Sequence, residues 1–167
     1  ASIALRYGVS IKSIKYGLKA FSGVKRRLQF INECKGVKVY DDYGHHPTAI
    51  KTTLEGLKAS VKKSVICIFQ PHRYTRTEEF LKDFSKSFSF ADKVIITNIF
   101  AANEENINNV SGKDIVDLMK KDKHKSVRYI ENKFDAVNIL AEESSVGDVI
   151  VTMGAGDIHM ILEPLVD

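Results

Sequence analysis

Apolar residues follow two alternating patterns along most of the chain. Short, nearly continuous apolar runs rich in valine and isoleucine alternate with longer segments in which apolar residues recur every three or four positions. The first pattern is typical of buried β-strands and the second of amphipathic helices. The runs predict strands at 64–70, 92–100, 126–131 and 147–154, and the periodic segments predict helices at 47–60, 75–91, 111–121, 132–144 and 155–165.

Strands that alternate with helices of this length predict a Rossmann-like, doubly wound α/β fold with helices on both faces of a mostly parallel sheet. Residues 27–42 contain two further strand-like runs, separated by the turn signal Lys35-Gly36. Such a signal predicts a β-hairpin. We therefore expect about six strands, one of them an antiparallel edge strand.

The first 22 residues have a different pattern. They predict two short helices, with Gly8 as the stop signal of the first. We expect a boundary near residue 23, which separates a helical stub (1–22) from a sheet domain (23–167). Because the chain begins in mid-helix and without methionine, we expect it to be a piece of a longer protein.

Several helix starts can be predicted from single residues. Pro47 suits the first position of a helix because its missing N–H has no partner there. Thr75 and Glu78 have the spacing of a capping box. Ser111 and Asn132 are expected to cap the two helices that follow them.

Composition places the chain among globular proteins, with 44% hydrophobic and 28% charged residues. The net charge of +4 is distributed over short runs of lysine, which are typical of solvated faces, so we expect no nucleic-acid partner. Cys34 and Cys67 lie in apolar runs and form no CxxC pair, which indicates free thiols in a reducing compartment. With no apolar run of about 18 residues and no signal peptide, we expect a cytoplasmic protein that does not insert into membranes.

Four polar clusters follow strands of the predicted sheet. They are "DDYGHHP" (41–47), "QPHRYTRT" (70–77), "NIFAANEEN" (98–106) and "TMGAGD" (152–157). In open α/β sheets, ligands bind outside the carboxyl ends of the strands. We therefore expect these clusters to meet at one edge of the sheet and to form a binding site.

The second cluster favours an anion. Arg73 and Arg76 lie at the start of a predicted helix, whose free N–H groups attract negative charge, and His72 adds a third basic side chain. The guanidinium group fits a carboxylate or phosphate with two parallel hydrogen bonds. The alternative is that one arginine caps a neighbouring helix while the other lies in solvent.

His45 and His46 raise the question of a metal. Asp42 and His72 could complete a ligand set, but the spacing matches no metal signature, so we expect no metal in this chain. His46 is instead expected to cap the helix that Pro47 begins. Neither a GxSxG elbow nor a Walker A sequence is present, and "GAG" at 154–156 is expected to form a tight turn. Any phosphate loop must therefore lie in another part of the protein.

Four segments carry a family resemblance. "GVKRR" (23–27), "DDYGHHPT" (41–48), "FQPHRYTRT" (69–77) and "TMGAGDI" (152–158), in this order and spacing, resemble the C-terminal domain of the Mur ligases of bacterial peptidoglycan synthesis. Among these ligases, the segments are most similar to the member that joins L-alanine to UDP-N-acetylmuramate. The resemblance covers nearly the whole chain, and it makes residues 1–22 similar to the tail of the family's central domain.

The resemblance implies an ATP-dependent reaction through an acyl phosphate, in a three-domain enzyme. The missing N-terminal domain would hold the UDP-sugar, the missing central domain would hold ATP and Mg²⁺, and this chain would bring in the amino acid. It therefore implies no catalytic residue and no metal ligand in this fragment, which we expect to be inactive alone. The residues that match the family's binding positions are Arg27 (with Arg26 as the alternative) and Asp42 for ATP, and Tyr43, His45, His72, Arg73 and Arg76 for the amino acid.

Three alternatives remain open at this point. The nearest competitor within the family is the relative that recycles the murein tripeptide, which carries a different version of the segment "FQPHRYTR". A doubly wound domain can also act alone as a nucleotide-binding module. Finally, the polar clusters could be helix caps and surface residues of a structural domain.

Overall fold

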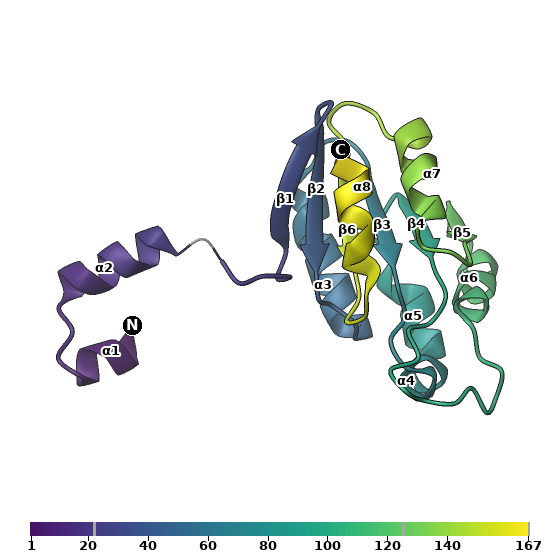
Figure 1. Ribbon diagram of the computed structural model, residues 1–167, viewed down its shortest axis with the longest axis horizontal. Helices are drawn as coiled ribbons and strands as arrows, with labels where there is room; N and C mark the ends of the chain where they lie inside the picture. Colours follow the sequence, from purple (N-terminus) through teal and green to yellow (C-terminus); the bar gives the residue numbers. More distant parts are fainter. Residues whose placement is uncertain (22, 125, 167) are drawn as a thin grey trace.

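The computed structural model describes residues 1–21, 23–124 and 126–166. Its centre is a six-stranded sheet with the order β1-β2-β6-β3-β4-β5 (Figure 1). The strands are β1 (Gln29–Cys34), β2 (Val37–Asp42), β3 (Val65–Phe69), β4 (Lys93–Ile96), β5 (Val127–Tyr129) and β6 (Val149–Met153). The hairpin of β1 and β2 is antiparallel and all the other pairs are parallel, which confirms the predicted fold class and its antiparallel edge strand.

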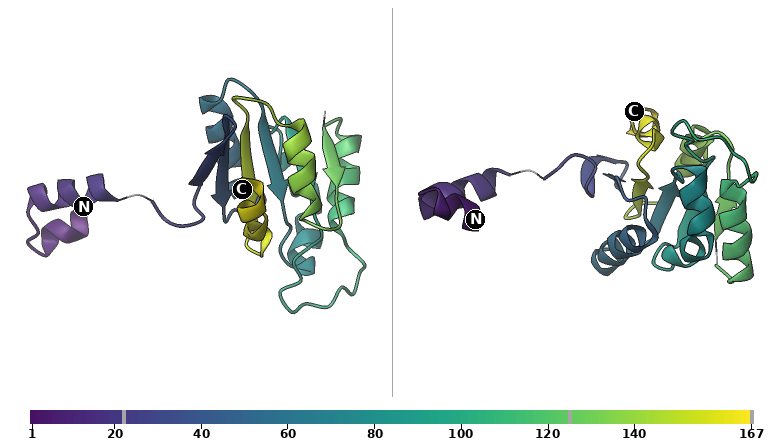
Figure 2. Two further views of the ribbon diagram at one scale, coloured as in Figure 1. Left: turned by 45° about the horizontal axis from the view of Figure 1, so that its top comes forward. Right: turned by 90° about the horizontal axis from the view of Figure 1, so that it is seen from below.

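The direction of each crossover determines which face of the sheet its helix covers. The helices of the sheet domain are α3 (Pro47–Ser60), α4 (Tyr74–Glu79), α5 (Leu81–Ser87), α6 (Gly112–Lys121), α7 (Asp135–Glu143), the 3-10 turn η1 (Ile158–Ile161) and α8 (Leu162–Val166). The connections through α3, α5 and α6 run toward β5, whereas the connection through α7 runs back to β6. Because parallel crossovers are right-handed, α7 and α8 cover the face opposite α3, α5 and α6 (Figure 2).

Each face of the sheet has its own apolar layer. Ile50, Leu54, Phe84 and Met119 pack against one face, and Leu140, Ile158 and Ile161 pack against the other. Every residue of β3 and β6 is buried, as expected for central strands covered on both sides. Burial of this kind stabilises a domain by about 25 cal/mol for each Å² of apolar surface removed from water.

The helix starts agree with the sequence in part. Pro47 begins α3, and Nδ1 of His46 accepts the N–H of Thr48, 3.3 Å away, so the predicted cap is confirmed. Ser111 and Asp114 form a capping box at α6.

Two other predicted starts need correction. The predicted box of Thr75 and Glu78 is wrong, because Thr75 hydrogen-bonds Glu104 instead, and the predicted helix is divided into α4 and α5 at Phe80. Asn132 accepts the N–H of Phe134, and α7 begins only at Asp135.

The N-terminal helices α1 (Ser2–Arg6) and α2 (Ile11–Ala20) lie apart from the sheet domain (Figure 1). Neither helix has a buried residue, which suits a segment that needs another surface to pack against. The predicted boundary between residues 22 and 23 falls beside Ser22, which is outside the described residues, and it stays a prediction. No helix in the described part of the chain is long and apolar enough to cross a membrane.

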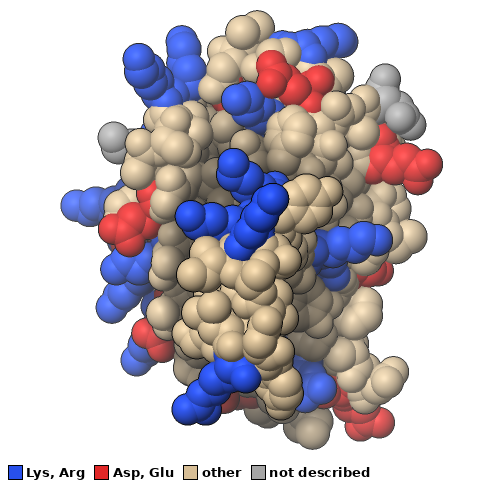
Figure 3. All heavy atoms as spheres, turned by 90° about the vertical axis from the view of Figure 1, so that its left-hand side faces the viewer, with Lys and Arg blue, Asp and Glu red and all other residues tan. Residues whose placement is uncertain are grey.

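Charge is less evenly distributed than the lysine runs suggested. The first 32 residues contain seven lysines and arginines and no acidic residue, so the rest of the chain has a net negative charge. Figure 3 shows basic side chains over the face of the molecule that carries the N-terminal segment. The positive charge is therefore concentrated next to the predicted domain boundary.

Candidate functional site

The parallel strands place their carboxyl ends at one edge of the sheet, and the predicted loops meet there. His72, after β3, forms an isolated parallel bridge with Phe100, after β4. Its ring also lies 6.0 Å from that of His45, after β2. Two of the four polar clusters are thus in direct contact through their histidines, and a third contributes Phe100.

Asp42, at the end of β2, holds the loop that follows it. The residue is 7% exposed, and its carboxylate accepts the N–H of Leu28 at 2.8 Å and the N–H of Gly44 at 2.7 Å. Each carboxylate oxygen can accept a second hydrogen bond. The contact of Asp42 with ribose hydroxyl groups stays a prediction. It would use the second acceptor position on each carboxylate oxygen.

Tyr43 and His45 form the next part of this edge. Tyr43 is 38% exposed, and its ring packs edge-to-face on the ring of His45 at 5.4 Å. Nδ1 of His45 lies 3.0 Å from the carbonyl of Tyr43, a contact that orients the imidazole. Tyr43 thus packs on His45, and the ring of His45 in turn lies beside that of His72.

Arg26 and Arg27, the two candidates from the sequence, have different environments. Arg26 pairs with the buried Asp41 through Nε at 3.0 Å and donates to the carbonyls of Gly154 (2.7 Å) and Gly156 (3.3 Å). Its guanidinium also lies 4.9 Å from the ring centre of Tyr43. Arg27 is exposed. Arg26 therefore has a structural role, and Arg27 is the one that is accessible to a ligand.

The "GAG" segment forms a bend between β6 and η1. Gly154 has φ of 146°, a conformation that side chains rarely adopt. A Cβ atom at this position would lie 2.7 Å from the carbonyl oxygen of Gln70. The turn thus places its carbonyls where Arg26 can bind them.

His72 and Arg76 form a pair at the start of α4. Nη1 of Arg76 lies 3.3 Å from Nδ1 of His72, and the ring of His72 stacks on Phe100 with an interplanar angle of 16°. An arginine can only donate, so Nδ1 accepts and the proton of neutral His72 is on Nε2. Partial burial, together with the charges of Arg76, His45 and Arg73, lowers the pKa of His72.

This pKa shift makes the stability of the chain depend on pH. In the unfolded chain His72 binds a proton near pH 6.5, but the folded chain binds it only at lower pH. Stability from this residue is therefore lost as pH falls through about 6.5. The free energy of unfolding, measured with urea, should fall between pH 7.5 and pH 5.5. His72→Gln is expected to make this decrease smaller. The same change at the exposed His159 is the control, and an equal effect there would contradict the prediction.

Arg73 has an unusual backbone conformation, with φ of 72° and ψ of 140°, a region that costs residues other than glycine on the order of 1–3 kcal/mol. Its N–H donates to the carbonyl of Phe100 at 2.9 Å, and its own carbonyl accepts the N–H of Thr77. Its side chain is half exposed. The backbone of Arg73 is thus held in place while its guanidinium remains accessible.

The expected free helix N-terminus is not available to a ligand. The N–H of Thr75 donates to the carboxylate of Glu104 at 3.1 Å. The side chains of Arg73 and Arg76, and not the N–H of Thr75, are therefore the groups expected to bind an anion at this edge. The sequence predicted that the cluster 98–106 belongs to the site but did not single out Glu104, which lies about thirty residues from Thr75 and follows no motif.

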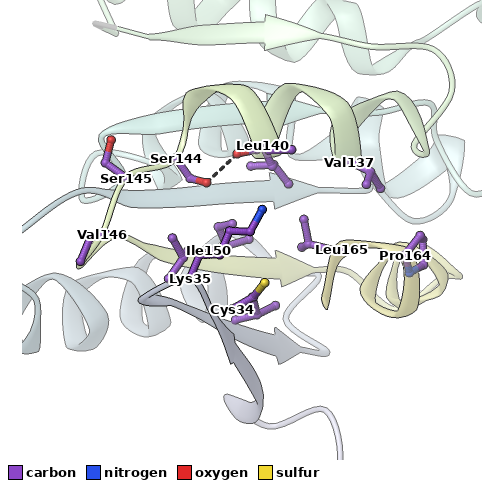
Figure 4. Close-up of a pocket in the computed structure, with 13 residues that line it drawn as sticks. Cys34, Lys35, Val137, Leu140, Ser144, Ser145, Val146, Ile150, Pro164 and Leu165 are labelled. Carbon is purple, nitrogen blue, oxygen red and sulfur yellow. Dashed lines mark hydrogen bonds between the residues drawn. The ribbon is translucent and has the colours of Figure 1, made fainter. Parts of the chain in front are cut away.

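The described residues contain no group of three or more His, Cys, Asp or Glu side chains that could hold a metal ion. Cys67 is buried, and this burial raises the pKa of its thiol. Cys34 is half-buried. It lines a cavity of about 610 Å³ between α7 and α8 (Figure 4). This cavity is mainly apolar and lies near the amino ends of β2 and β6, so it is separate from the strand-end site.

The chain resembles known proteins over its whole length. The family model for the glutamate ligase domain of Mur ligases matches residues 26–156. UDP-N-acetylmuramate–L-alanine ligases of Caldanaerobacter subterraneus and Brachyspira hyodysenteriae are 44% and 45% identical over 100% and 95% of this chain. These alignments cover 36% and 34% of the two relatives, so the chain spans about a third of their length.

Solved structures agree with this result. The UDP-N-acetylmuramate–alanine ligase of Thermotoga maritima superimposes with a TM-score of 0.80 at 26% identity, over 99% of this chain and 34% of that chain. A murein peptide ligase of Psychrobacter arcticus gives 0.72 at 25% identity, over 99% and 35%.

Proposed function

This chain belongs to the Mur ligase family, and we propose that it is the amino-acid-binding C-terminal domain of a ligase that joins L-alanine to UDP-N-acetylmuramate with ATP. The observation that supports this most directly is the convergence of His45, His72 and Arg76 at one edge of the sheet. Sequence identity above 40% to L-alanine ligases over nearly the whole chain favours alanine over the murein tripeptide. We further propose that the enzyme works in the cytoplasm on the path to peptidoglycan.

The side chains at this edge suit an amino acid as substrate. Arg73 and Arg76 would bind its carboxylate through charge-assisted hydrogen bonds. Tyr43 and His45 would line the space next to it. Because His72 is neutral, its free nitrogen carries a proton and can donate a hydrogen bond without adding charge.

The reaction itself would take place between domains. We propose that the carboxylate of UDP-N-acetylmuramate first attacks the γ-phosphate of ATP, which forms an acyl phosphate and releases ADP. The amine of alanine then attacks the acyl carbon, and phosphate leaves. The N-terminal and central domains would hold the UDP-sugar and most of the ATP and Mg²⁺. This chain would contribute Arg27 and Asp42 to ATP and would bring the amine to the acyl phosphate by closing, which is a proximity effect.

The test is a product assay with the full-length enzyme. It is incubated with UDP-N-acetylmuramate, ATP and either L-alanine or the murein tripeptide, and the products are identified by mass. We expect the L-alanine adduct and release of one phosphate. Formation of only the tripeptide adduct would assign the chain to the recycling ligases, and no adduct with either acceptor would contradict the proposed function.

The chain by itself is expected to bind ATP and alanine weakly and to form no product. Each ligand would contact only the part of its site that this domain supplies, while the rest belongs to missing domains. Calorimetric titration of residues 1–167 with each ligand is the measurement. Micromolar affinity for either ligand would contradict this prediction.

A further inference from the structure

The loop between β4 and α6 forms one wall of the site. Phe100 stacks on His72, and the following residues make a turn in which the N–H of Glu104 donates to the carbonyl of Ala101 at 3.1 Å. Ala102 and Asn103, inside this turn, have φ of 51° and 66°. Asparagine tolerates this left-handed conformation better than most residues. The turn directs Glu104 back toward α4.

Glu104 makes a set of contacts at the start of α4. Its Oε2 accepts the N–H of Thr75 at 3.1 Å, and its Oε1 accepts the hydroxyl of Thr75 at 2.8 Å. Oε1 also lies 3.9 Å from Nε of Arg73. Partial desolvation acts to raise the pKa of Glu104, but the hydrogen bonds from Thr75 and Tyr74 and the charge of Arg73 outweigh it and hold the pKa below its usual value. The carboxylate is thus ionised at neutral pH.

This arrangement places a fixed negative charge beside the guanidinium of Arg73. Both threonine bonds hold the carboxylate of Glu104 in one place, and the ion pair is on the Nε side of Arg73. The two Nη groups then remain available for a second carboxylate. Arginine side chains lose considerable rotamer freedom when they are held, so an orientation set before binding lowers the entropic cost of taking up the substrate.

Glu104 also sets the charge of the site. Arg73 and Arg76 contribute two positive charges, Glu104 contributes one negative charge, and His72 is neutral near pH 7. The four side chains together have one net positive charge. A single positive charge matches the one carboxylate of an amino acid better than the double charge of a free phosphate.

We propose that Glu104 is a positioning residue for the incoming amino acid, which acts through Arg73 by orienting its guanidinium toward the substrate carboxylate. This inference rests on the proposed function, because it concerns the amino-acid site of that ligase. Glu104 itself does not contact the substrate.

The experiment compares three variants of the full-length enzyme. Glu104→Gln keeps the size of the side chain and removes its charge, and it is expected to raise the KM for L-alanine on the order of tenfold. The KM for ATP, the KM for UDP-N-acetylmuramate and kcat at saturating alanine should change less than about twofold. Glu104→Asp keeps the charge and is expected to raise the alanine KM less than Glu104→Gln does. Glu105→Gln, at an exposed neighbouring position, is the matched control and should behave as the wild type.

A double-variant cycle shows whether the effect passes through Arg73. In an Arg73→Ala background, Glu104→Gln should change the alanine KM by less than about twofold, since the group that it orients is already gone. A full tenfold effect in that background would overturn the inference, and so would equal changes in the KM of all three substrates. A shift in the pH profile of kcat would also overturn it, because that result would place Glu104 at the reacting amine.

The two proposals fail in different ways. If the enzyme forms no adduct with L-alanine, the proposed function is wrong. If it forms the adduct and Glu104→Gln leaves the alanine KM unchanged, only the role of Glu104 is wrong.

Discussion

Replacing Arg76 by alanine in the full-length enzyme is expected to raise the KM for L-alanine about 30-fold or more. Arg76 is half-buried, and its Nη1 is bound to Nδ1 of His72. This contact orients the guanidinium, and its other N–H groups remain available to the substrate. Loss of a charge-assisted hydrogen bond costs on the order of 2 kcal/mol, which is about 30-fold in affinity at 1.36 kcal/mol per factor of ten. The measurement is steady-state kinetics with each of the three substrates varied in turn.

The effect should be limited to the amino acid. The KM for ATP and for UDP-N-acetylmuramate should change less than about threefold, because other domains hold most of their contacts. Arg76→Lys should lower the KM for L-alanine only slightly below that of Arg76→Ala. An ammonium group cannot make two parallel bonds to a carboxylate while also binding His72. Lys82→Ala, at an exposed position of α5, is the control for loss of a positive charge nearby. Equal increases for all three substrates would show a folding defect and contradict the assignment of Arg76.

The second large effect is expected on stability. Arg26→Met should lower the free energy of unfolding of this chain by about 3–5 kcal/mol, the usual cost of leaving a buried charge without its partner. Asp41 is 2% exposed, and after the change the hydroxyl of Thr152, 2.7 Å away, would be the one side-chain partner left to its carboxylate among the described residues. The carbonyls of Gly154 and Gly156 would also lose their donors. Urea unfolding of the chain at pH 7 measures the change.

The neighbouring arginine provides a matched control. Arg27→Met changes the same charge one residue away but at an exposed position, so it should alter the free energy of unfolding by no more than about 0.5 kcal/mol. In the full-length enzyme the same variant should instead raise the KM for ATP. If Arg27→Met destabilised the chain as much as Arg26→Met, the structural role of Arg26 would be refuted.

Much of the architecture could be predicted from local pattern. The buried strands β3 and β6 are short runs of apolar, mostly β-branched residues, and their order among helical segments predicted a mostly parallel sheet. Pro47 and Ser111 marked helix starts correctly. These features depend on residues within a few positions of one another, so a single sequence contains the information.

Other local signals were overruled by contacts between distant residues. The spacing of Thr75 and Glu78 predicted a capping box, but the carboxylate that binds Thr75 is that of Glu104. The single helix predicted for residues 75–91 is divided at Phe80. A residue from another loop can replace a local cap whenever the fold places it closer, and the spacing of a motif does not reveal this.

The sequence by itself determined the fold class, the family and the segments that carry the site, because hydrophobic period, turn chemistry and motif spacing are properties of neighbouring residues. Only the tertiary structure showed that Arg26 is held by Asp41 while Arg27 remains exposed, and that Glu104 occupies the helix start beside Arg73. Adjacent arginines have the same chemistry, and their difference arises from which way each side chain points. The position of Glu104 depends on β4 pairing with β3, which brings the loops that follow these two strands together.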